Sequence, residues 1–436
     1  MNKLISKYIL HITSKFKPVL IKILPIELLR CVKRKFVNKC IDKSVESKKA
    51  PFERNKYPDG INLIGFIRGE IGLGQSCRLL ADAVNYSNLD FTIYNYEQIS
   101  SMRYNDNSWD SKITNTAPFN INLMHINPPD LALAHVTLNK DIWDYKYNIA
   151  FWLWELEEFP EDWVKCFSLV DEIWTPSEFA SNSIRKKTSL PVHTIGYPIS
   201  APVAEAYNRE YFELPEDKFL FLCMYDSNST IHRKNPIGTI EAFKKAFSKD
   251  WDNVGLVIKV NNPQQEDIIK IKKMLDGYHN IYLIPKIMTK IEVNSLIKSC
   301  DVFVSLHRAE GFGLPLAEAM LLGTPTIATN WSANTEFMNN DVACMVDYNL
   351  IPLEIDYAMY KKGNRWADPD INQAAVFMKK LYEDKDYYNR ISKNAQNYIK
   401  NNLNQEVASK AIENRINAIY NDEVENEDNS SYYGRW

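Results

Sequence analysis

Residues 305–330 read SLHRAEGFGLPLAEAMLLGTPTIATN, and this stretch decides the fold. The apolar run at residues 301–306 predicts a buried strand of a parallel sheet. A glycine pair follows, Pro315 stands where the first turn of a helix begins, and Gly323 ends that short helix. Residues 325–329 then start another strand. The order strand, glycine loop, helix, strand is typical of a doubly wound α/β sheet.

The loop between this strand and this helix predicts an anion site flanked by two acids. Backbone N–H groups of the loop and of the helix N-terminus can face a single anion. Glu310 precedes the loop and Glu318 lies in the helix. A carboxylate repels phosphate, but it accepts hydrogen bonds from hydroxyls. A diphosphate with a sugar at each end matches both kinds of group, so the segment predicts a nucleotide-sugar site.

The same residues resemble the Glu-x7-Glu signature of retaining GT-B glycosyltransferases, in particular family 4. The resemblance covers Glu310 to Glu318, with Gly-Phe-Gly-Leu-Pro intact at residues 311–315. It implies that the first acid and the following backbone amides hold the donor sugar, and that the second acid holds the ribose hydroxyls. The donor-binding residues expected here are Glu310, Gly311, Phe312, Gly313, Leu314 and Glu318. The alternative is a turn with two surface glutamates on an ordinary α/β protein.

Alternating strands and helices from residue 51 onward predict parallel sheets with crossover helices. Strands are expected at residues 60–67, 91–96, 121–126, 148–153, 172–177 and 192–195, and then at 219–225, 254–260, 281–284, 302–306 and 326–328. Thr289 is expected to cap a helix, with Glu292 in the capping-box position. The fold class expected is therefore α/β, and the resemblance implies a GT-B arrangement of two Rossmann-like doubly wound domains facing a central cleft.

Five segments follow from this pattern. We expect a basic amphipathic segment at residues 1–50, an N-terminal Rossmann-like acceptor domain at 51–200 and a C-terminal Rossmann-like donor domain at 201–404. The resemblance implies that residues 405–420 form a helix that crosses back to the first domain. Residues 421–436 are acidic and polar, and we expect them to be disordered.

A basic pair follows the first strand of the expected second domain. Arg233 and Lys234 stand just before a helix begins. A guanidinium and an ammonium beside helix N–H groups suit a diphosphate leaving group. The alternative is a solvated basic turn. Family members often place an Arg directly after this strand, where Met224 and its neighbours stand here, and Lys259 is a candidate for the missing charge.

Two further candidates lie in the expected first domain. Residues 69–75, GEIGLGQ, follow a strand and open a helix, and the resemblance implies that Gly72 and Gly74 face the donor diphosphate. A tight structural turn is the alternative, because a lone glycine loop is a weak signal. His125 ends a strand where family members carry a His that touches the donor sugar; the alternative is a structural histidine. The catalytic residues expected are Glu310, His125, Arg233 and Lys234.

Residues 151–160, FWLWELEEFP, combine aromatic rings with carboxylates. Such a mixture can bind sugars at an acceptor site, since rings stack on C–H surfaces and carboxylates accept hydrogen bonds from hydroxyls. The alternative is that Trp152 lies in the core and the glutamates lie in water.

No pattern indicates a metal or a disulfide. The Asp-x-Asp motifs at 368–370 and 384–386 are expected in a loop and on a polar helical surface, and no His or Cys spacing fits a metal. The seven cysteines are scattered and include no Cys-x-x-Cys, as in reduced thiols of a cytosolic protein. We therefore expect no cofactor and no metal, with Arg233, Lys234 and helix dipoles neutralising the diphosphate.

Charge is unevenly distributed along the chain. The net charge is −3, so no general attraction to nucleic acid is expected. Residues 1–49 hold 13 Lys and Arg against 3 Asp and Glu, a net charge of +10, so the rest carries −13. The segment is too often charged to span a bilayer, which takes about 20 apolar residues. It is typical of a helix on an anionic membrane, or of a helix packed on its own protein. We expect a cytoplasmic protein, peripheral on the inner face of the cell membrane.

The expected activity is the retaining, metal-independent transfer of a hexose from UDP-hexose or GDP-hexose. The expected acceptor is a glycan or lipid-linked glycan, in the synthesis of a bacterial surface polysaccharide such as a capsule or lipopolysaccharide. The alternatives are a catalytically silent subunit that binds sugar nucleotides, and a GT-B epimerase or phosphorylase. A phosphorylase would need a pyridoxal-binding lysine, and no context marks one.

Overall fold

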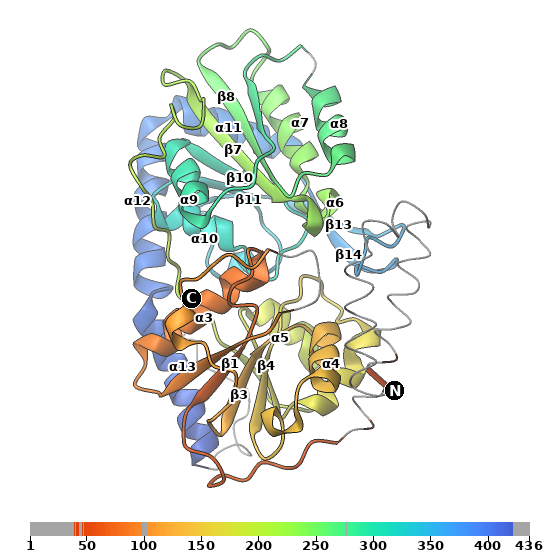
Figure 1. Cartoon of the computed structure of the whole chain (residues 1–436). Coiled ribbons are helices and arrows are strands. Elements are labelled where there is room, and N and C mark those ends of the chain that lie inside the picture. The colour runs from red at the N-terminus through yellow and green to blue at the C-terminus, as the bar shows by residue number, and fades with distance from the viewer. Residues whose placement is uncertain are drawn as a thin grey trace. The chain divides into compact units, whose positions relative to one another are not determined.

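The computed structural model describes residue 39, residues 41–42, residue 46 and residues 48–97, 103–275 and 277–421. The basic segment expected at residues 1–50 lies almost wholly outside this range, and so does the tail expected at 421–436 apart from its first residue. The described chain forms two compact units (Figure 1). The first unit comprises the chain up to Leu153, Glu158–Pro198 and the segment that begins at Gln405. The second unit comprises Trp154–Glu157 and Ile199–Asn404.

The first unit is built on a parallel sheet of six strands in the order β2-β1-β3-β4-β5-β6. The strands are β1 (Ile61–Gly65), β2 (Phe91–Asn95), β3 (Ile121–His125), β4 (Tyr147–Phe151), β5 (Glu172–Thr175) and β6 (Val192–Thr194). Its helices include α3 (Gly72–Tyr86), α4 (Pro128–Thr137), η3 (Glu161–Leu169), α5 (Glu178–Arg185) and α13 (Gln405–Tyr420). Every residue of β1, β3 and β4 is buried, as expected for parallel strands covered on both faces.

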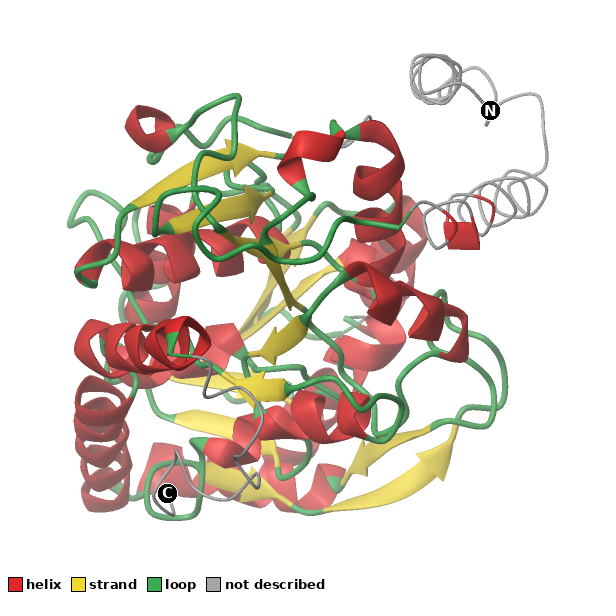
Figure 2. Cartoon of the chain, turned by 90° about the horizontal axis from the view of Figure 1, so that it is seen from below, coloured by secondary structure: helices red, strands yellow, loops and turns green. Residues whose placement is uncertain are grey.

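The second unit is built on another parallel sheet of six strands, in the order β12-β11-β10-β7-β8-β9. The strands are β7 (Phe219–Asp226), β8 (Val254–Asn261), β9 (Ile281–Ile284), β10 (Val302–Ser305), β11 (Thr326–Thr329) and β12 (Cys344–Val346). The helices are α6 (Ile231–Lys234), α7 (Pro236–Ala246), α8 (Gln265–Met274), α9 (Lys290–Ser299), α10 (Leu314–Leu321), α11 (Ile371–Glu383) and α12 (Lys385–Asn402). Helices flank the strands (Figure 2), and rings such as Phe221 and Phe243 fill the core between them.

Each strand predicted from the sequence is present, with both ends within two residues of the expected position. The capping box on α9 is also confirmed. The Thr289 hydroxyl accepts a hydrogen bond from the backbone N–H of Glu292, and the Glu292 side chain accepts one from the backbone N–H of Thr289. Two expectations need correction. Residues 69–75 were expected as a loop before a helix, but α3 begins at Gly72, so most of this glycine loop belongs to the helix. Asp368 lies in a strand rather than in a loop.

An antiparallel hairpin that the sequence did not predict interrupts the second unit. β13 (Tyr348–Pro352) pairs with β14 (Arg365–Pro369), and the tip of the hairpin spans residues 353–364. The tip is closed by hydrogen bonds between Leu353 and the backbone of Gly363 and Asn364. The sequence did not predict this hairpin, because the residues of β13 do not alternate between buried and exposed positions.

The last helix, α13, packs on α3 within the first unit (Figure 1). Arg415 of α13 donates two hydrogen bonds to the buried carboxylate of Glu172 on β5, from Nε at 2.8 Å and from Nη2 at 2.7 Å. Tyr147 and Trp174 donate to the same carboxylate, at 3.0 Å and 2.5 Å. The charge of Glu172 is therefore fully compensated only while α13 is in place.

Removing this guanidinium should destabilise the first unit. We predict that Arg415→Met lowers the free energy of unfolding by about 3–5 kcal/mol, because it leaves Glu172 charged and buried without its cation. Urea denaturation followed by circular dichroism measures the loss. Lys410→Ala, at an exposed position of the same helix, is the matched control and should change stability little. Equal stability of the Arg415 and Lys410 variants would contradict the role of this ion pair.

Candidate functional site

The glycine loop of the second unit ends in a backbone conformation that requires glycine. Gly313 has φ +95°, in the left-handed region, and it is the N-cap of α10. Gly311 is needed for a different reason, because a Cβ there would lie 2.9 Å from the carbonyl oxygen of Trp154. Pro315 stands in the first turn of α10. The first N–H groups of α10 have no acceptor inside the helix, so this end of the helix suits an anion.

Arg233, Lys234 and Glu310 form a buried charge cluster beside this loop. Lys234 makes an ion pair with Oε1 of Glu310, and Nη1 of Arg233 lies 3.4 Å from Oε2. Nη1 of Arg233 also donates to the carbonyl oxygen of Ala309 at 2.8 Å. Nε of Arg233 is buried, and in the part of the chain that the structure describes it has no hydrogen-bond partner. The cluster therefore keeps one unused donor on its buried cation.

The cations fix the ionisation of Glu310. Burial alone would raise the pKa of this carboxyl, but Lys234, Arg233 and His307 outweigh burial and lower the pKa to about 2. Glu310 is therefore a carboxylate at neutral pH. Its backbone N–H donates to Ser332 Oγ at 2.8 Å, which fixes the chain at the start of the loop.

Local caps hold the two cations in place. Thr230, at φ +65°, accepts a hydrogen bond from the backbone N–H of Arg233 at 3.2 Å and so caps the short helix α6. Asn235, at φ +49°, ends α6 and caps α7, and its side-chain amide donates to the carbonyl oxygen of Leu306 at 2.9 Å. The basic pair thus lies on a turn tied directly to the loop that carries Glu310, and it is not a solvated turn.

Glu318 lies further along α10 and is 1% exposed. Lys290 of α9 makes an ion pair with Oε1 of Glu318. Oε2 of Glu318, by contrast, accepts no hydrogen bond from any described residue. Burial raises the pKa of Glu318, and Lys290 opposes this shift. A buried acid with open acceptor positions suits a ligand that brings hydroxyl groups.

The remaining donor-binding candidate of the second unit, Lys259, lies inside a strand. It is 4% exposed and stands in β8, in register with Met224 and Ile284. The expected strand 254–260 contains Lys259 near its end, and β8 continues one residue further, to Asn261. Phe312 is also buried, with its ring centroid 5.3 Å from that of Phe337.

His125, Gly72 and Gly74 belong to the first unit. His125 is fully buried, its Nε2 lies 2.6 Å from Ser76 Oγ, and its ring stacks on Phe151 with centroids 5.1 Å apart. Its Nδ1 has no hydrogen-bond partner among the residues described. Burial lowers the pKa of His125 to about 4, so the ring is neutral at pH 7. A Cβ at Gly74 would clash with the carbonyl oxygen of Gly69 at 2.0 Å, whereas one at Gly72 would meet open space.

The sequence did not predict some of the residues that contact the candidate site. Lys290 and Ser332 touch Glu318 and Glu310 but stand in no pattern that marks them. Glu155 lies 3.8 Å from Arg233 Nη2, although the sequence placed it among acceptor-site candidates of the first domain. In the same segment Trp152 and Trp154 are fully buried, which supports a core role for these two rings.

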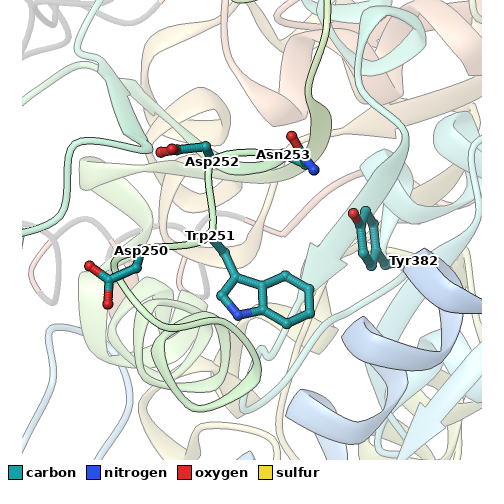
Figure 3. Close-up of a pocket in the computed structure, with 5 residues that line it drawn as sticks. All are labelled: Asp250, Trp251, Asp252, Asn253 and Tyr382. Atoms are coloured by element: carbon teal, nitrogen blue, oxygen red, sulfur yellow. The ribbon is translucent and has the colours of Figure 1, made fainter.

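The second unit also has a hollow close to the start of β8 (Figure 3). It has a volume of about 460 Å³ and is lined by Asp250, Trp251, Asp252, Asn253 and Tyr382. Asn253 immediately precedes β8, whereas Glu310 follows the carboxyl end of β10, a strand that runs in the same direction. Ligands of open α/β sheets bind at the carboxyl ends of the strands. We therefore place the candidate site at Glu310 and not at this hollow.

Neither a metal centre nor a membrane span is found in the described part of the chain. No group of three or more His, Cys, Asp or Glu residues there could hold a metal ion. No helix there is both long and apolar enough to cross a bilayer. The five cysteines that the structure describes are buried and unpaired.

The sequence of this chain is similar to sequences of known glycosyltransferases. Residues 208–398, most of the second unit, match the family described as Glycosyl transferases group 1. The serotype-specific mannosyltransferase WbdA of Escherichia coli is 26% identical over 178 residues, which cover 38% of this chain. The chain spans only 21% of the length of that relative.

Solved structures share the fold at low identity. Alr3699/HepE of Anabaena, in complex with UDP and glucose, gives a TM-score of 0.61 at 11% identity, covering 83% of this chain and 100% of the other. A glycosyltransferase from Rickettsia africae ESF-5 gives 0.60 at 13% identity, covering 85% and 100%. Together with the two parallel-sheet units, these matches support a GT-B fold.

The buried state of His125 makes stability depend on pH. The folded protein holds the ring neutral down to about pH 4, whereas the unfolded chain takes up the proton near 6.5. The stabilisation by the neutral ring is therefore complete above pH 6.5 and is lost as the pH falls toward 4, on the order of 3 kcal/mol. We predict that stability in urea falls less between pH 7 and pH 4.5 in His125→Gln than in the wild type. Parallel declines in the two proteins would contradict this.

Proposed function

We propose that this protein is a retaining glycosyltransferase that moves a hexose from UDP-hexose or GDP-hexose to a hydroxyl of a glycan or lipid-linked glycan. The observation that carries the proposal is the arrangement around α10. A buried guanidinium with an unused donor, a helix N-terminus and a buried acid with open acceptor positions belong to one unit. A nucleoside diphosphate sugar supplies an anion for the first two and hydroxyls for the third.

In this proposal the second unit holds the donor. Arg233 and Lys234, with the first amides of α10, bind the diphosphate, helped by the backbone of Gly311, Phe312, Gly313 and Leu314. Glu318 accepts hydrogen bonds from the ribose hydroxyls, and Glu310 orients both the cations and the sugar. No metal or cofactor is required, since two buried cations and a helix N-terminus oppose the charge of the leaving group.

The proposed reaction retains the configuration at the sugar carbon. The bond between that carbon and the β-phosphate oxygen breaks, and the acceptor oxygen bonds to the carbon from the same face. The departing phosphate oxygen takes the proton of the acceptor hydroxyl, so the products are a glycoside and a nucleoside diphosphate. Positioning and electrostatic stabilisation supply the catalysis.

The first unit contributes the acceptor side in this proposal. His125 has no proton-transfer step, because its ring is neutral and buried, and its proposed contact with the donor sugar rests on the family resemblance. Gly72 and Gly74 form the start of α3, whose N-terminus suits a phosphate or an acceptor hydroxyl. Lys259 is buried in β8 and contributes its charge to the donor domain from within the sheet.

We also propose a pathway for this activity, the synthesis of a bacterial surface polysaccharide. The similarity to a serotype-specific mannosyltransferase supports the synthesis of a bacterial surface polysaccharide, with mannose among the candidate sugars. The basic residues of the segment 1–49 would bring the protein to the anionic inner face of the cell membrane, where a lipid-linked acceptor lies.

Two isosteric changes separate the roles of the acids. We predict that Glu318→Gln weakens nucleoside diphosphate binding by about 10–100-fold, since it removes a charged acceptor. Glu310→Gln should lower turnover more than nucleotide affinity. Calorimetry measures the binding, and release of nucleoside diphosphate from a panel of UDP-, GDP- and ADP-sugars measures the turnover.

Glu241→Gln, at an exposed position of α7, is the matched control. Wild-type activity in both the Glu310 and the Glu318 variant would contradict the assignment. Tight donor binding without turnover on any acceptor would favour the silent subunit, and interconversion of nucleotide sugars would favour an epimerase.

The membrane role has its own test. Residues 1–35 contain nine Lys and Arg, each worth about 1 kcal/mol at an anionic surface. We predict that replacing these nine residues by Gln abolishes co-sedimentation with phosphatidylserine-containing vesicles. Pure phosphatidylcholine vesicles are the control and should bind neither protein. Undiminished sedimentation of the variant would reject the role.

A further inference from the structure

The segment Trp154–Glu157 is separated in sequence from the rest of the second unit but packs within it. The ring of Trp154 is 1% exposed and lies against Tyr360, with centroids 5.6 Å apart. The carbonyl oxygen of Trp154 stands so close to Gly311 that no larger residue fits there. Glu157 makes an ion pair with Arg365 at 3.1 Å. The segment is thus fixed against both the glycine loop and the hairpin.

The hairpin β13–β14 brings Tyr360 to the same place. Its base is tied to the chain before Glu310, because Ala367 N–H donates to the carbonyl oxygen of Arg308 at 2.9 Å. Its tip packs on α6, with the ring of Tyr357 4.6 Å from that of His232. Tyr360 itself is 4% exposed, and its ring lies 5.7 Å from the guanidinium carbon of Arg233.

The carboxylate of Glu155 has fewer close cation contacts than the carboxylate of Glu310. Glu310 has a cation on each oxygen. Glu155 lies 3.8 Å from Arg233, beyond hydrogen-bond distance, and its side chain is 21% exposed. Tyr360 lies beside it: burial raises the pKa of this phenol, Arg233 opposes the shift, and both the charge of Glu155 and a side-chain hydrogen bond to Glu155 add to it. Tyr360 is therefore a neutral phenol whose proton is directed at Glu155 and whose oxygen can accept a hydrogen bond from a ligand.

Glu155 adds a second negative charge to the cluster. Arg233 and Lys234 are balanced by Glu310 and Glu155, so the four side chains carry no net charge. An extra carboxylate near the guanidinium opposes the binding of a diphosphate. A carboxylate with an accessible oxygen in this position is suited to a ligand group that donates hydrogen bonds, as the hydroxyls of a hexose do.

We propose that Glu155 and Tyr360 form a second recognition surface for the transferred sugar, with Glu155 accepting a hydrogen bond from one of its hydroxyls and the Tyr360 hydroxyl completing the contact. This inference rests on the proposed function and adds two residues outside the Glu-x7-Glu segment. It assigns the unpredicted hairpin and the Trp154–Glu157 segment a common task, the discrimination of the sugar rather than of the nucleotide.

The test compares a nucleotide sugar with its free nucleoside diphosphate. The pair is the UDP-, GDP- or ADP-sugar that gives the largest thermal shift with the wild type, together with the corresponding diphosphate. In Glu155→Gln, affinity for the nucleotide sugar should fall about 10-fold, as for loss of a charged acceptor. Affinity for the free diphosphate should stay equal or rise, because a negative charge near Arg233 is removed. Tyr360→Phe should show the same selective loss, smaller in size.

Glu158→Gln, at an exposed position next to this segment but outside the second unit, is the matched control and should leave both affinities unchanged. Equal weakening of sugar nucleotide and free diphosphate in Glu155→Gln would show a role in placing Arg233 and would overturn the inference. No change in either affinity would overturn it as well.

A result that rejects the proposed function can be distinguished from one that rejects only this inference. If the wild type binds no nucleoside diphosphate and no nucleotide sugar, the proposed function is wrong, and this inference with it. If the wild type binds both with equal affinity, the nucleotide site stands, and only the sugar-recognising surface is rejected.

Discussion

Two cations and two acids packed beside the N-terminus of α10 constrain the second unit. A buried charge is tolerated only when it is paired, and Arg233, Lys234 and Glu310 are each paired with another member of the group. The pairing requires the turn of α6 and the loop after β10 to lie at one edge of the sheet. Gly311 and Gly313 then follow as consequences, since the chain must pass close to Trp154 and turn sharply into α10.

The two units use buried charges in opposite ways. In the first unit Glu172 is saturated by Arg415, Tyr147 and Trp174, so nothing remains for a ligand. In the second unit Arg233 keeps a free Nε, and Oε2 of Glu318 accepts no hydrogen bond within the described residues. Unsatisfied buried groups cost stability, and a ligand that satisfies them recovers it. This contrast separates a structural ion pair from a binding site.

The sequence predicted those parts of the fold that local patterns encode. Strands such as 281–284 were found because apolar runs bounded by turn residues identify buried parallel strands. The capping box at Thr289 is equally local. The hairpin β13–β14 was missed, because its residues do not alternate between buried and exposed positions. The end of β8 lies one residue beyond the expected residue 260, because it depends on the neighbouring strands of the sheet.

The candidate site was predictable only where one motif holds it. Glu310, Glu318 and the glycines between them stand in a single segment, and the basic pair follows a strand end. Glu155 and Tyr360 come from segments about 80 residues before and 130 residues after Arg233, and only tertiary packing brings them to its side. Charge in the sequence could not distinguish Glu155 from its exposed neighbour Glu158.

The central claim is that this cluster binds a pyrophosphate while the acids bind hydroxyls. A crystal structure of the protein with an intact nucleotide sugar tests it most directly. The account predicts a phosphate oxygen within about 2.7–3.2 Å of Arg233 Nε and ribose hydroxyls at the same range from Glu318. A donor bound elsewhere, with Glu318 touching no hydroxyl and Arg233 no phosphate, would contradict it.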